Sequence, residues 1–308
     1  PQPVYAAGPV TTCTESALRI ALTGGGLVTF TCGPATITLT APITVTRSTT
    51  IDGGGLITFL GDGNSRIFDV TDNSVPNFEL KLIGLTVSGG RADSGGAVVV
   101  DNGNTVTVVN STLSNNVVQA RGGAIYAASA ATVNITNSTV ISNLAGGSGS
   151  AEGGAIYTMF ATVNIVNSAI ISNTVSDNRD GGGMYNFESD LILVNSTLSH
   201  NNTGNRGGAL VVNQSTALIT NTTISGNSAT RGGGLVIFNG GTVNTKNTII
   251  AGNTAPSGGP DCDFDSVTSQ GYNLIGDTSG CTITGDLTGN ITNQNPLLGS
   301  LADNGGAT

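Results

Sequence analysis

The feature that most constrains the fold is an internal repeat made of two alternating blocks. The first block is a double glycine followed by apolar residues, as in GGAIY at Gly122 and Gly153, and its six copies begin between Gly95 and Gly232 at spacings of 25 to 31 residues. The second is a seven-residue block that begins and ends with asparagine, such as NSTVISN at Asn137. Self-similarity at a period of roughly 20 to 50 residues is typical of solenoids, propellers and repeat arrays.

The segments between these blocks alternate apolar and polar residues, as in TVTVV, TVNIT and TVNIV. Strict alternation with many β-branched residues indicates strands and not helices. Three short strands separated by glycine or asparagine corners match one turn of a parallel β-helix. Side chains that face inward should then stack from coil to coil. We expect this of Val133, Ile135 and Val140, and of Val163, Ile165 and Ile170 one coil later.

The pattern therefore predicts an all-β protein that is a single parallel β-helix of roughly nine coils. Right-handedness follows from the crossover rule for parallel strands. A short helix over residues 13–22, where Leu18 and Leu22 are spaced i, i+4, is expected to cap the first coil. We divide the chain into a leader and cap at 1–27, the β-helix at 28–258 and a C-terminal cap or tail at 259–308.

The last asparagine of each seven-residue block is predicted to form a ladder along the rod. Asparagine tolerates left-handed corners, and its amide can bond to the asparagine of the next coil. The double glycines should provide positive φ or a close backbone approach. The predicted ladder comprises Asn116, Asn143, Asn173, Asn201, Asn227 and Asn253.

The four cysteines form two pairs, one near each end of the chain. Cys13 and Cys32, and Cys262 and Cys281, are each nineteen positions apart, without the CxxC spacing of zinc or redox sites. We predict the local disulfides Cys13–Cys32 and Cys262–Cys281. Paired cysteines indicate an oxidising compartment. The chain begins without methionine, so we expect a secreted protein whose signal peptide has been removed.

The charge balance excludes some classes of partner. The net charge is −9 with a pI near 4.3, and only two lysines occur, Lys81 and Lys246. Phosphate binding needs clustered basic residues, so we expect no nucleic-acid partner. No apolar run approaches the roughly 18 residues of a membrane span.

Because pectate lyases and polysaccharide hydrolases also use the β-helix, a catalytic site must be sought. Glu152 and Asp180 precede the double glycine in successive coils, and Arg121, Arg206 and Arg231 hold that position in other coils. A hydrolase needs two carboxylates, whereas alternating charges at one corner favour a structural charge ladder. We prefer the ladder. His200 is the only histidine and is interpreted as an exposed turn residue, which excludes a multi-histidine metal site.

Two further groups leave alternatives open. Tyr126, Tyr157 and Tyr185 form a column that alternation places outside, as a partner-binding stripe, but a shift of one residue would place them in the core. Asp261, Asp263 and Asp265 have the alternate spacing of a calcium loop, although the glycine and distal glutamate of an EF-hand are missing. We expect no cofactor and leave a structural calcium ion open.

Most of the chain resembles known bacterial secreted proteins. The stretch TCTESALRIALTGGGLVTFTCG is similar to the cysteine-led cap of secreted β-helix repeat proteins, and GGAIY and NSTVISN resemble the repeats of polymorphic outer-membrane proteins. The segment from DCDFDSVTSQGYNLIGDTSGCTITGDL to NPLLGSLADNGGAT resembles a choice-of-anchor tail. The resemblance implies a β-helix fold, export and attachment to a cell surface. Fold alone does not fix the biochemical role.

These observations predict a non-catalytic surface rod, structural or adhesive, with a β-helix lyase or glycoside hydrolase as the alternative. Ice binding through outward threonine columns is a third hypothesis, disfavoured by the variable coil length. Surface glycans, proteins or a second copy are the expected partners. For self-assembly, we expect Asn295–Thr308 or Pro1–Thr12 to dock on a neighbouring copy and build a head-to-tail fibre.

Overall fold

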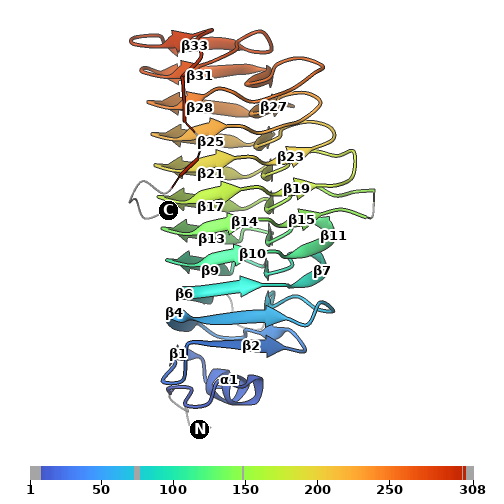
Figure 1. Ribbon diagram of the computed structural model, residues 1–308, viewed down its shortest axis with the longest axis vertical. Helices are drawn as coiled ribbons and strands as arrows, with labels where there is room; N and C mark the ends of the chain where they lie inside the picture. The colour runs from blue at the N-terminus through green and yellow to red at the C-terminus, as the bar shows by residue number, and fades with distance from the viewer. Residues whose placement is uncertain (1–7, 73–76, 148, 300, 303–308) are drawn as a thin grey trace.

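The computed structural model describes residues 8–72, 77–147, 149–299 and 301–302. The described chain is a right-handed parallel β-helix whose coils stack along one axis, with the single helix at the N-terminal end and β33 at the other (Figure 1). All named strand pairings are parallel, so every strand neighbours the equivalent strand of the next coil. The fold class is therefore the one that the repeat predicts.

The largest sheet has 20 strands, because most coils contribute two successive strands to it. In two of the early coils, one long strand takes the place of these two. Its strands are β1 (Gly26–Thr29), β2 (Ala35–Leu39), β4 (Thr49–Gly61), β6 (Glu79–Ser88), β9 (Thr105–Val109), β10 (Thr112–Ser114), β13 (Thr132–Thr136), β14 (Thr139–Ile141), β17 (Thr162–Val166), β18 (Ala169–Ile171), β21 (Asp190–Val194), β22 (Thr197–Ser199), β25 (Thr216–Thr220), β26 (Thr223–Ser225), β28 (Thr242–Lys246), β29 (Ile249–Ile250), β31 (Ser266–Gln270), β32 (Leu274–Ile275), β33 (Thr282–Asp286) and β34 (Ile291–Thr292).

Two smaller sheets close the tube. The nine-stranded sheet follows the double glycines and contains β3 (Ile43–Thr44), β5 (Phe68–Val70), β8 (Val98–Val100), β12 (Ile125–Ala128), β16 (Ile156–Met159), β20 (Met184–Phe187), β24 (Leu210–Asn213), β27 (Leu235–Phe238) and β30 (Cys262–Phe264). The five-stranded sheet contains β7 (Arg91–Ser94), β11 (Val117–Arg121), β15 (Leu144–Ala145), β19 (Thr174–Val175) and β23 (Asn202–Thr203).

The interior is a column of aliphatic side chains, as the alternation predicts. Val133 pairs with Val163 and Ile135 with Ile165 in adjacent coils, and all four side chains are fully buried. The next strands continue the column, with Val140 beside Ile170. Each coil therefore gains its apolar contacts from the coils above and below, which is why several repeats must fold together.

The helix α1 (Glu15–Leu22) covers the first coil. Thr14 is its N-cap, and the Thr14 side chain accepts a hydrogen bond from the backbone N–H of Ala17. Leu18 is fully buried against the interior column, so the helix closes this end. Arg19 is ion-paired with Glu15 at 2.7 Å and also donates to the backbone carbonyl of Pro42 in the coil beneath.

Both predicted disulfides are present, each with a Cα–Cα distance of 5.6 Å. Cys13–Cys32 ties the segment before α1 to the first coil, and Cys262–Cys281 joins β30 to the residue before β33. The sheets also continue past residue 258, the boundary expected from the sequence. Strands β30 to β34 pair in register with the preceding coils, so residues 262–292 extend the solenoid and do not form a separate tail.

The buried asparagines form a continuous ladder of hydrogen bonds along one corner. Each side-chain amide nitrogen donates to the Oδ1 atom of the next asparagine over 2.9 to 3.0 Å, and the same oxygen accepts the backbone N–H of the donor residue. A second amide hydrogen bonds to a backbone carbonyl one coil back, as between Asn143 and Leu113. The rungs are Asn116, Asn143, Asn173, Asn201, Asn227 and Asn253.

The left-handed corners lie next to these asparagines and not on them. The residue before the ladder position has positive φ, for example Ser142 at 56° and His200 at 55°. The first asparagine of each block is also left-handed, as at Asn137 with φ 49°. Each block therefore uses asparagine in two ways. Its first asparagine adopts the αL conformation at a corner, and its last asparagine is buried in the hydrogen-bonded ladder.

One inward column carries polar groups without a full set of partners. Ala127, Thr158, Asn186 and Val212 are aligned on successive coils and face the interior. The hydroxyl of Thr158 donates to Asn186 Oδ1 over 2.9 Å, but the buried Asn186 Nδ2 has no hydrogen-bond partner. An unpaired buried amide costs about 1 to 3 kcal/mol.

Replacing this pair by apolar residues should stabilise the rod. We expect the double variant Thr158→Val/Asn186→Val to raise the free energy of unfolding by about 1 to 2 kcal/mol, because both polar groups are removed together. Urea titration followed by circular dichroism measures the change. The single variant Thr158→Val is the control and should gain nothing, since the amide remains. Destabilisation of the double variant would contradict an unpaired Asn186.

Candidate functional site

The charged residues that precede the double glycines meet at the corner between the five-stranded and nine-stranded sheets. Arg121 and Glu152 are bridge partners in adjacent coils, and so are Arg206 and Arg231. Asp180 lies between these pairs in the stack, because the N–H of Gly153 bonds to its carbonyl and the N–H of Gly181 bonds to the carbonyl of Arg206. We call this column, Arg121, Glu152, Asp180, Arg206 and Arg231, the charged corner.

Every carboxylate of the charged corner is ion-paired with an arginine. Arg121 Nε lies 3.0 Å from Glu152 Oε2, and Arg206 Nη2 lies 3.0 Å from Asp180 Oδ2. Asp180 is only 5% exposed, and its Oδ1 also accepts hydrogen bonds from the Asn205 side chain and from the backbone N–H of Arg206. The charged corner is thus half-buried.

The electrostatics of the two carboxyl groups follow from this burial. Desolvation raises the pKa of Glu152 and of Asp180, and the neighbouring guanidinium groups of Arg121 and Arg206 oppose the shift. A glycosidase pair needs carboxylates that can reach sugar and water. Here Glu152 Oε2 and both carboxylate oxygens of Asp180 contact arginines, so the geometry matches a structural charge ladder better than a catalytic pair.

The three tyrosines lie on the outer face of the nine-stranded sheet but are not an exposed stripe. Their rings stack at centroid distances of 5.6 Å for Tyr126–Tyr157 and 5.5 Å for Tyr157–Tyr185. Tyr157 and Tyr185 are only 3% and 6% exposed, and they form a second apolar cluster with Val211 and Val236. The outward placement expected from alternation holds, but the rings do not form an exposed stripe, because rings that stack along the rod cover each other's faces.

The surroundings of these rings raise the pKa values of the tyrosine hydroxyl groups. Burial raises the pKa of Tyr185 to about 12 and shifts the pKa of Tyr157 in the same direction. The guanidinium carbon of Arg121 lies 4.8 Å from the centre of the Tyr157 ring, and the Tyr185 hydroxyl accepts a hydrogen bond from Asn213. The tyrosines are therefore neutral at physiological pH and join the charged corner to the outer cluster.

Sequence reasoning missed the continuation of this arrangement toward the C-terminal end. Arg231 Nε lies 2.8 Å from Asp263 Oδ2, and its guanidinium carbon is 4.4 Å from the centre of the Phe264 ring. Arg206 lies 5.2 Å from the Phe238 ring centre. Phe187 and Phe238 occupy one position of the repeat, two coils apart, but Phe264 aligns with Ile237, so periodicity does not predict the contact between Arg231 and Phe264.

The fold gives the three aspartates of the candidate calcium loop different surroundings. Asp261 Oδ1 accepts hydrogen bonds from the backbone and side chain of Asn253 and so ends the asparagine ladder. Asp263 pairs with Arg231, and Asp265 is exposed. Among the described residues, no group of three or more His, Cys, Asp or Glu side chains could hold a metal ion. Only Asp263 lies within β30, whereas Asp261 precedes the strand and Asp265 follows it, so the three side chains do not share one face of a strand.

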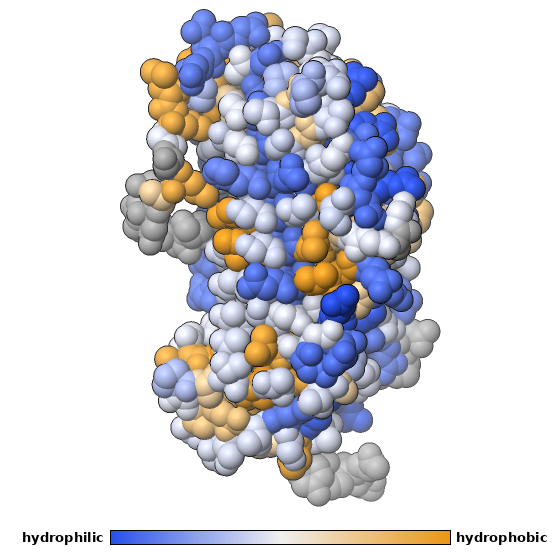
Figure 2. All heavy atoms as spheres, turned by 45° about the vertical axis from the view of Figure 1, so that its right-hand side comes forward, coloured by the Kyte–Doolittle hydropathy of each residue, from blue (hydrophilic) through white to orange (hydrophobic). Residues whose placement is uncertain are grey.

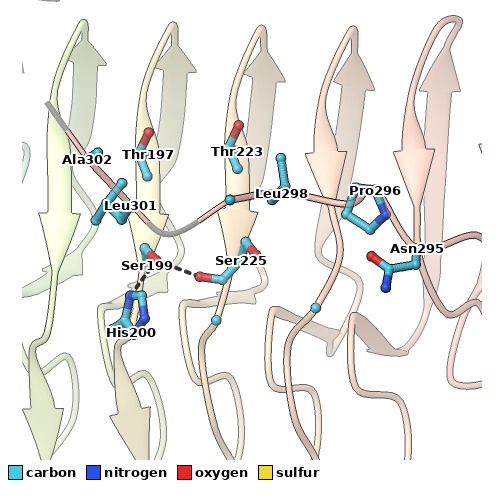
Figure 3. A pocket seen from close by; sticks show the side chains of 13 residues that line it. Thr197, Ser199, His200, Thr223, Ser225, Asn295, Pro296, Leu298, Leu301 and Ala302 are labelled. Carbon is cyan, nitrogen blue, oxygen red and sulfur yellow. Dashed lines mark hydrogen bonds between the residues drawn. The ribbon is translucent and has the colours of Figure 1, made fainter. Parts of the chain in front are cut away.

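A surface groove of about 640 Å³ lies where the chain returns along its own flank (Figure 3). The segment 295–299 runs toward Thr223 of β26, and Leu301 and Ala302 lie beside Thr197 of β22. His200 is exposed beside it, and its Nδ1 lies 2.7 Å from Ser199 Oγ. That hydroxyl donates to the carbonyl of Ser225, so its proton is already engaged and it is not an activated nucleophile.

This groove bears on the expected head-to-tail contact. The described part of Asn295–Thr308 lies against the chain's own coils, whereas residues 300 and 303–308 and most of Pro1–Thr12 lie outside the described residues. Docking on a neighbouring copy therefore stays a prediction. In the described part of the chain, no helix is long and apolar enough to cross a membrane.

The coils, ladder and closed tube define a right-handed parallel β-helix protein. A sequence model described as "Right handed beta helix region" matches residues 95–292 of the 308, and the chain belongs to this family. No curated protein matches. A similar solved structure is that of a Streptococcus pneumoniae surface protein and adhesin, PfbA, with 12% identity, a TM-score of 0.47, and coverage of 94% of this chain and 98% of that one.

Proposed function

We propose that this protein is a non-catalytic rod of a bacterial cell surface, structural or adhesive in role. The observation that carries the proposal is the closure of the charged corner, where Glu152 and Asp180 are each ion-paired with an arginine. Two disulfides in a chain without free cysteines support an extracellular location. A stiff solenoid closed by a helix at one end serves as a spacer that presents its faces to partners.

The resemblance of the repeats to polymorphic outer-membrane proteins, and of the C-terminal segment to anchor tails, supports attachment to a surface. The rod would offer long, flat sheet faces to surface glycans, to proteins or to other copies of itself. The competing proposal is a polysaccharide lyase or glycoside hydrolase that uses Glu152 and Asp180. Raised pKa values of both carboxyl groups are what a general acid would need, so this alternative has to be tested directly.

Incubation with neutral and acidic polysaccharides tests the two proposals. We expect no new reducing ends and no absorbance of unsaturated products, because both carboxylates are engaged by arginines. If turnover appears, Glu152→Gln and Asp180→Asn show whether it belongs to the corner, with the exposed Asp190→Asn as the matched control. Turnover that both corner variants abolish and the control retains would replace the structural proposal by the enzymatic one.

A further inference from the structure

Exposed apolar side chains are scattered over the rod, and Figure 2 shows small hydrophobic patches among polar surface on one side of it. Two exposed phenylalanines differ from most of the others in backbone conformation. Phe160 is 49% exposed with φ 54°, and Phe264 is 42% exposed with φ 80°. The left-handed region is unfavourable for a bulky residue, and strained residues cluster at functional sites. These two rings are therefore candidates for contact with a partner.

Phe160 occupies a corner at which the following coils carry polar residues. Its N–H bonds to the carbonyl of Phe187, and the same corner is occupied in the next three coils by Glu188, Gln214 and Asn239, which are all exposed and have positive φ. Asparagine adopts this conformation with less strain than phenylalanine. The corner itself thus does not require an aromatic side chain.

The two exposed phenylalanines extend a row of aromatic rings on the outer side of the nine-stranded sheet. We call Phe160, Phe187, Phe238 and Phe264 the aromatic row. Its rings form two pairs, with centroid distances of 6.0 Å for Phe160–Phe187 and 6.4 Å for Phe238–Phe264. Phe187 and Phe238 align through Asn213 of the coil between them, so two coil spacings, or about 9.6 Å, separate them.

Amide groups lie between the two pairs, and the row is held in place before any ligand binds. The side chain of Gln214 is exposed and has no hydrogen-bond partner in the part of the chain that the structure describes. Asn213 Oδ1 accepts a hydrogen bond from the side chain of Asn239 over 2.9 Å. The guanidinium carbon of Arg231 lies 4.4 Å from the centre of the Phe264 ring. Such contacts reduce the entropy that binding would otherwise cost.

We propose that the aromatic row binds a neutral, unbranched glycan whose sugars are β-1,4-linked, with the glycan chain along the rod axis. In such a chain successive sugars are turned over, so alternate sugars present the same face, and two sugars span a length close to that of two coils. The apolar C–H faces of sugars pack on aromatic rings, and their hydroxyl groups bond to amides. Alternate sugars would then contact the two phenylalanine pairs, and the sugar between them would face Gln214.

Charge favours a neutral glycan over an acidic one. The protein carries a net charge of −9, and the exposed Glu188 lies at the corner of the row. Arg206 and Arg231, which contact rings of the row, are already ion-paired with carboxylates. An acidic chain would be repelled, whereas a neutral chain is not. This inference rests on the proposed surface role, in which glycans are one class of partner, and it names the glycan and the residues that bind it.

Isothermal titration calorimetry with β-1,4-linked hexasaccharides of glucose, mannose, xylose and N-acetylglucosamine tests the proposal. We expect at least one of them to bind, and its disaccharide to bind at least tenfold more weakly, because a disaccharide cannot reach both pairs. Hexasaccharides of glucose linked β-1,3 or α-1,4 should also bind at least tenfold more weakly, since their chains curve. A protein that binds none of the β-1,4-linked chains, that binds the other linkages equally well, or that prefers polygalacturonate would overturn the proposal.

Phe160→Asn and Phe264→Asn test the row itself. Asparagine suits the left-handed conformation, and each variant should bind about tenfold more weakly, the size of one aromatic contact. Tyr272→Asn is the matched control and should bind normally, because Tyr272 is 62% exposed with φ 59° but lies at another corner, between β31 and β32. Equal thermal melting shows that the fold is intact. If a phenylalanine variant does not fold, Gln214→Ala replaces it and should also weaken binding. Unchanged affinity in the folded variants of the row would overturn the assignment.

The same titrations separate this inference from the proposed non-catalytic role, when reducing ends are counted in each mixture afterwards. New reducing ends together with binding would contradict the non-catalytic role and leave the glycan assignment in place. Absence of both binding and new reducing ends would overturn the glycan assignment and leave a surface rod that has another partner.

Discussion

Replacing Gly154 by alanine is expected to lower the free energy of unfolding by more than about 4 kcal/mol, or to prevent folding. A Cβ atom at this position would lie 2.1 Å from the carbonyl oxygen of Gly182 and 2.7 Å from backbone atoms of Thr174. These neighbours belong to the hydrogen-bonded backbone of the rod and cannot move aside as a flexible side chain can. Overpacking of this kind exceeds the usual cost of about 1 to 3 kcal/mol.

Urea denaturation monitored by circular dichroism measures this effect. Gly8→Ala is the matched control, because a Cβ atom on Gly8 would meet nothing within 4 Å, and it should unfold like the natural protein. The neighbouring Gly153 has φ 66°, a left-handed conformation that favours glycine. The double glycine therefore combines two requirements, one conformational and one steric. Normal stability of Gly154→Ala would mean that adjacent coils are further apart than the structure shows.

The second large effect is expected for Asn173→Ala, at about 3 kcal/mol. Asn173 Oδ1 accepts both the backbone N–H and the side-chain amide of Asn143, each over 2.9 Å, and its own amide donates to Asn201 and to the carbonyl of Val140. The substitution leaves two donors of Asn143 buried without an acceptor. Each buried unpaired group costs about 1 to 3 kcal/mol.

Asn164→Ala provides the comparison for Asn173→Ala. Asn164 is half-buried on the outer face, and its amide makes a single side-chain bond to Asn134. We expect a loss below about 1 kcal/mol, since water can replace that bond. The two variants should therefore separate clearly in urea midpoint at unchanged m-value. Similar midpoints for both would show that the buried ladder contributes no more than an exposed amide pair.

The local and periodic features of this protein follow from its sequence. Alternation in segments such as Thr132–Thr136 places Val133 and Ile135 inside, because successive side chains of a strand point to opposite faces. Repetition then brings equivalent residues of adjacent coils together, so the fold class, the interior column and the asparagine rungs can all be assigned without coordinates. The spacing of the cysteines was sufficient for the disulfides, because each pair lies within one local stretch of chain.

Contacts outside the repeat were decided only by the tertiary structure. Alternation correctly placed Tyr157 outside the sheet, yet its 3% exposure depends on stacking with Tyr126 and Tyr185 and on Arg121 above its ring. Likewise, the spacing of Asp261 and Asp263 could not show that one ends the asparagine ladder and the other pairs with Arg231. Periodicity determines which face a side chain occupies. Its burial and partners depend on the packing of non-equivalent residues, which differs from coil to coil.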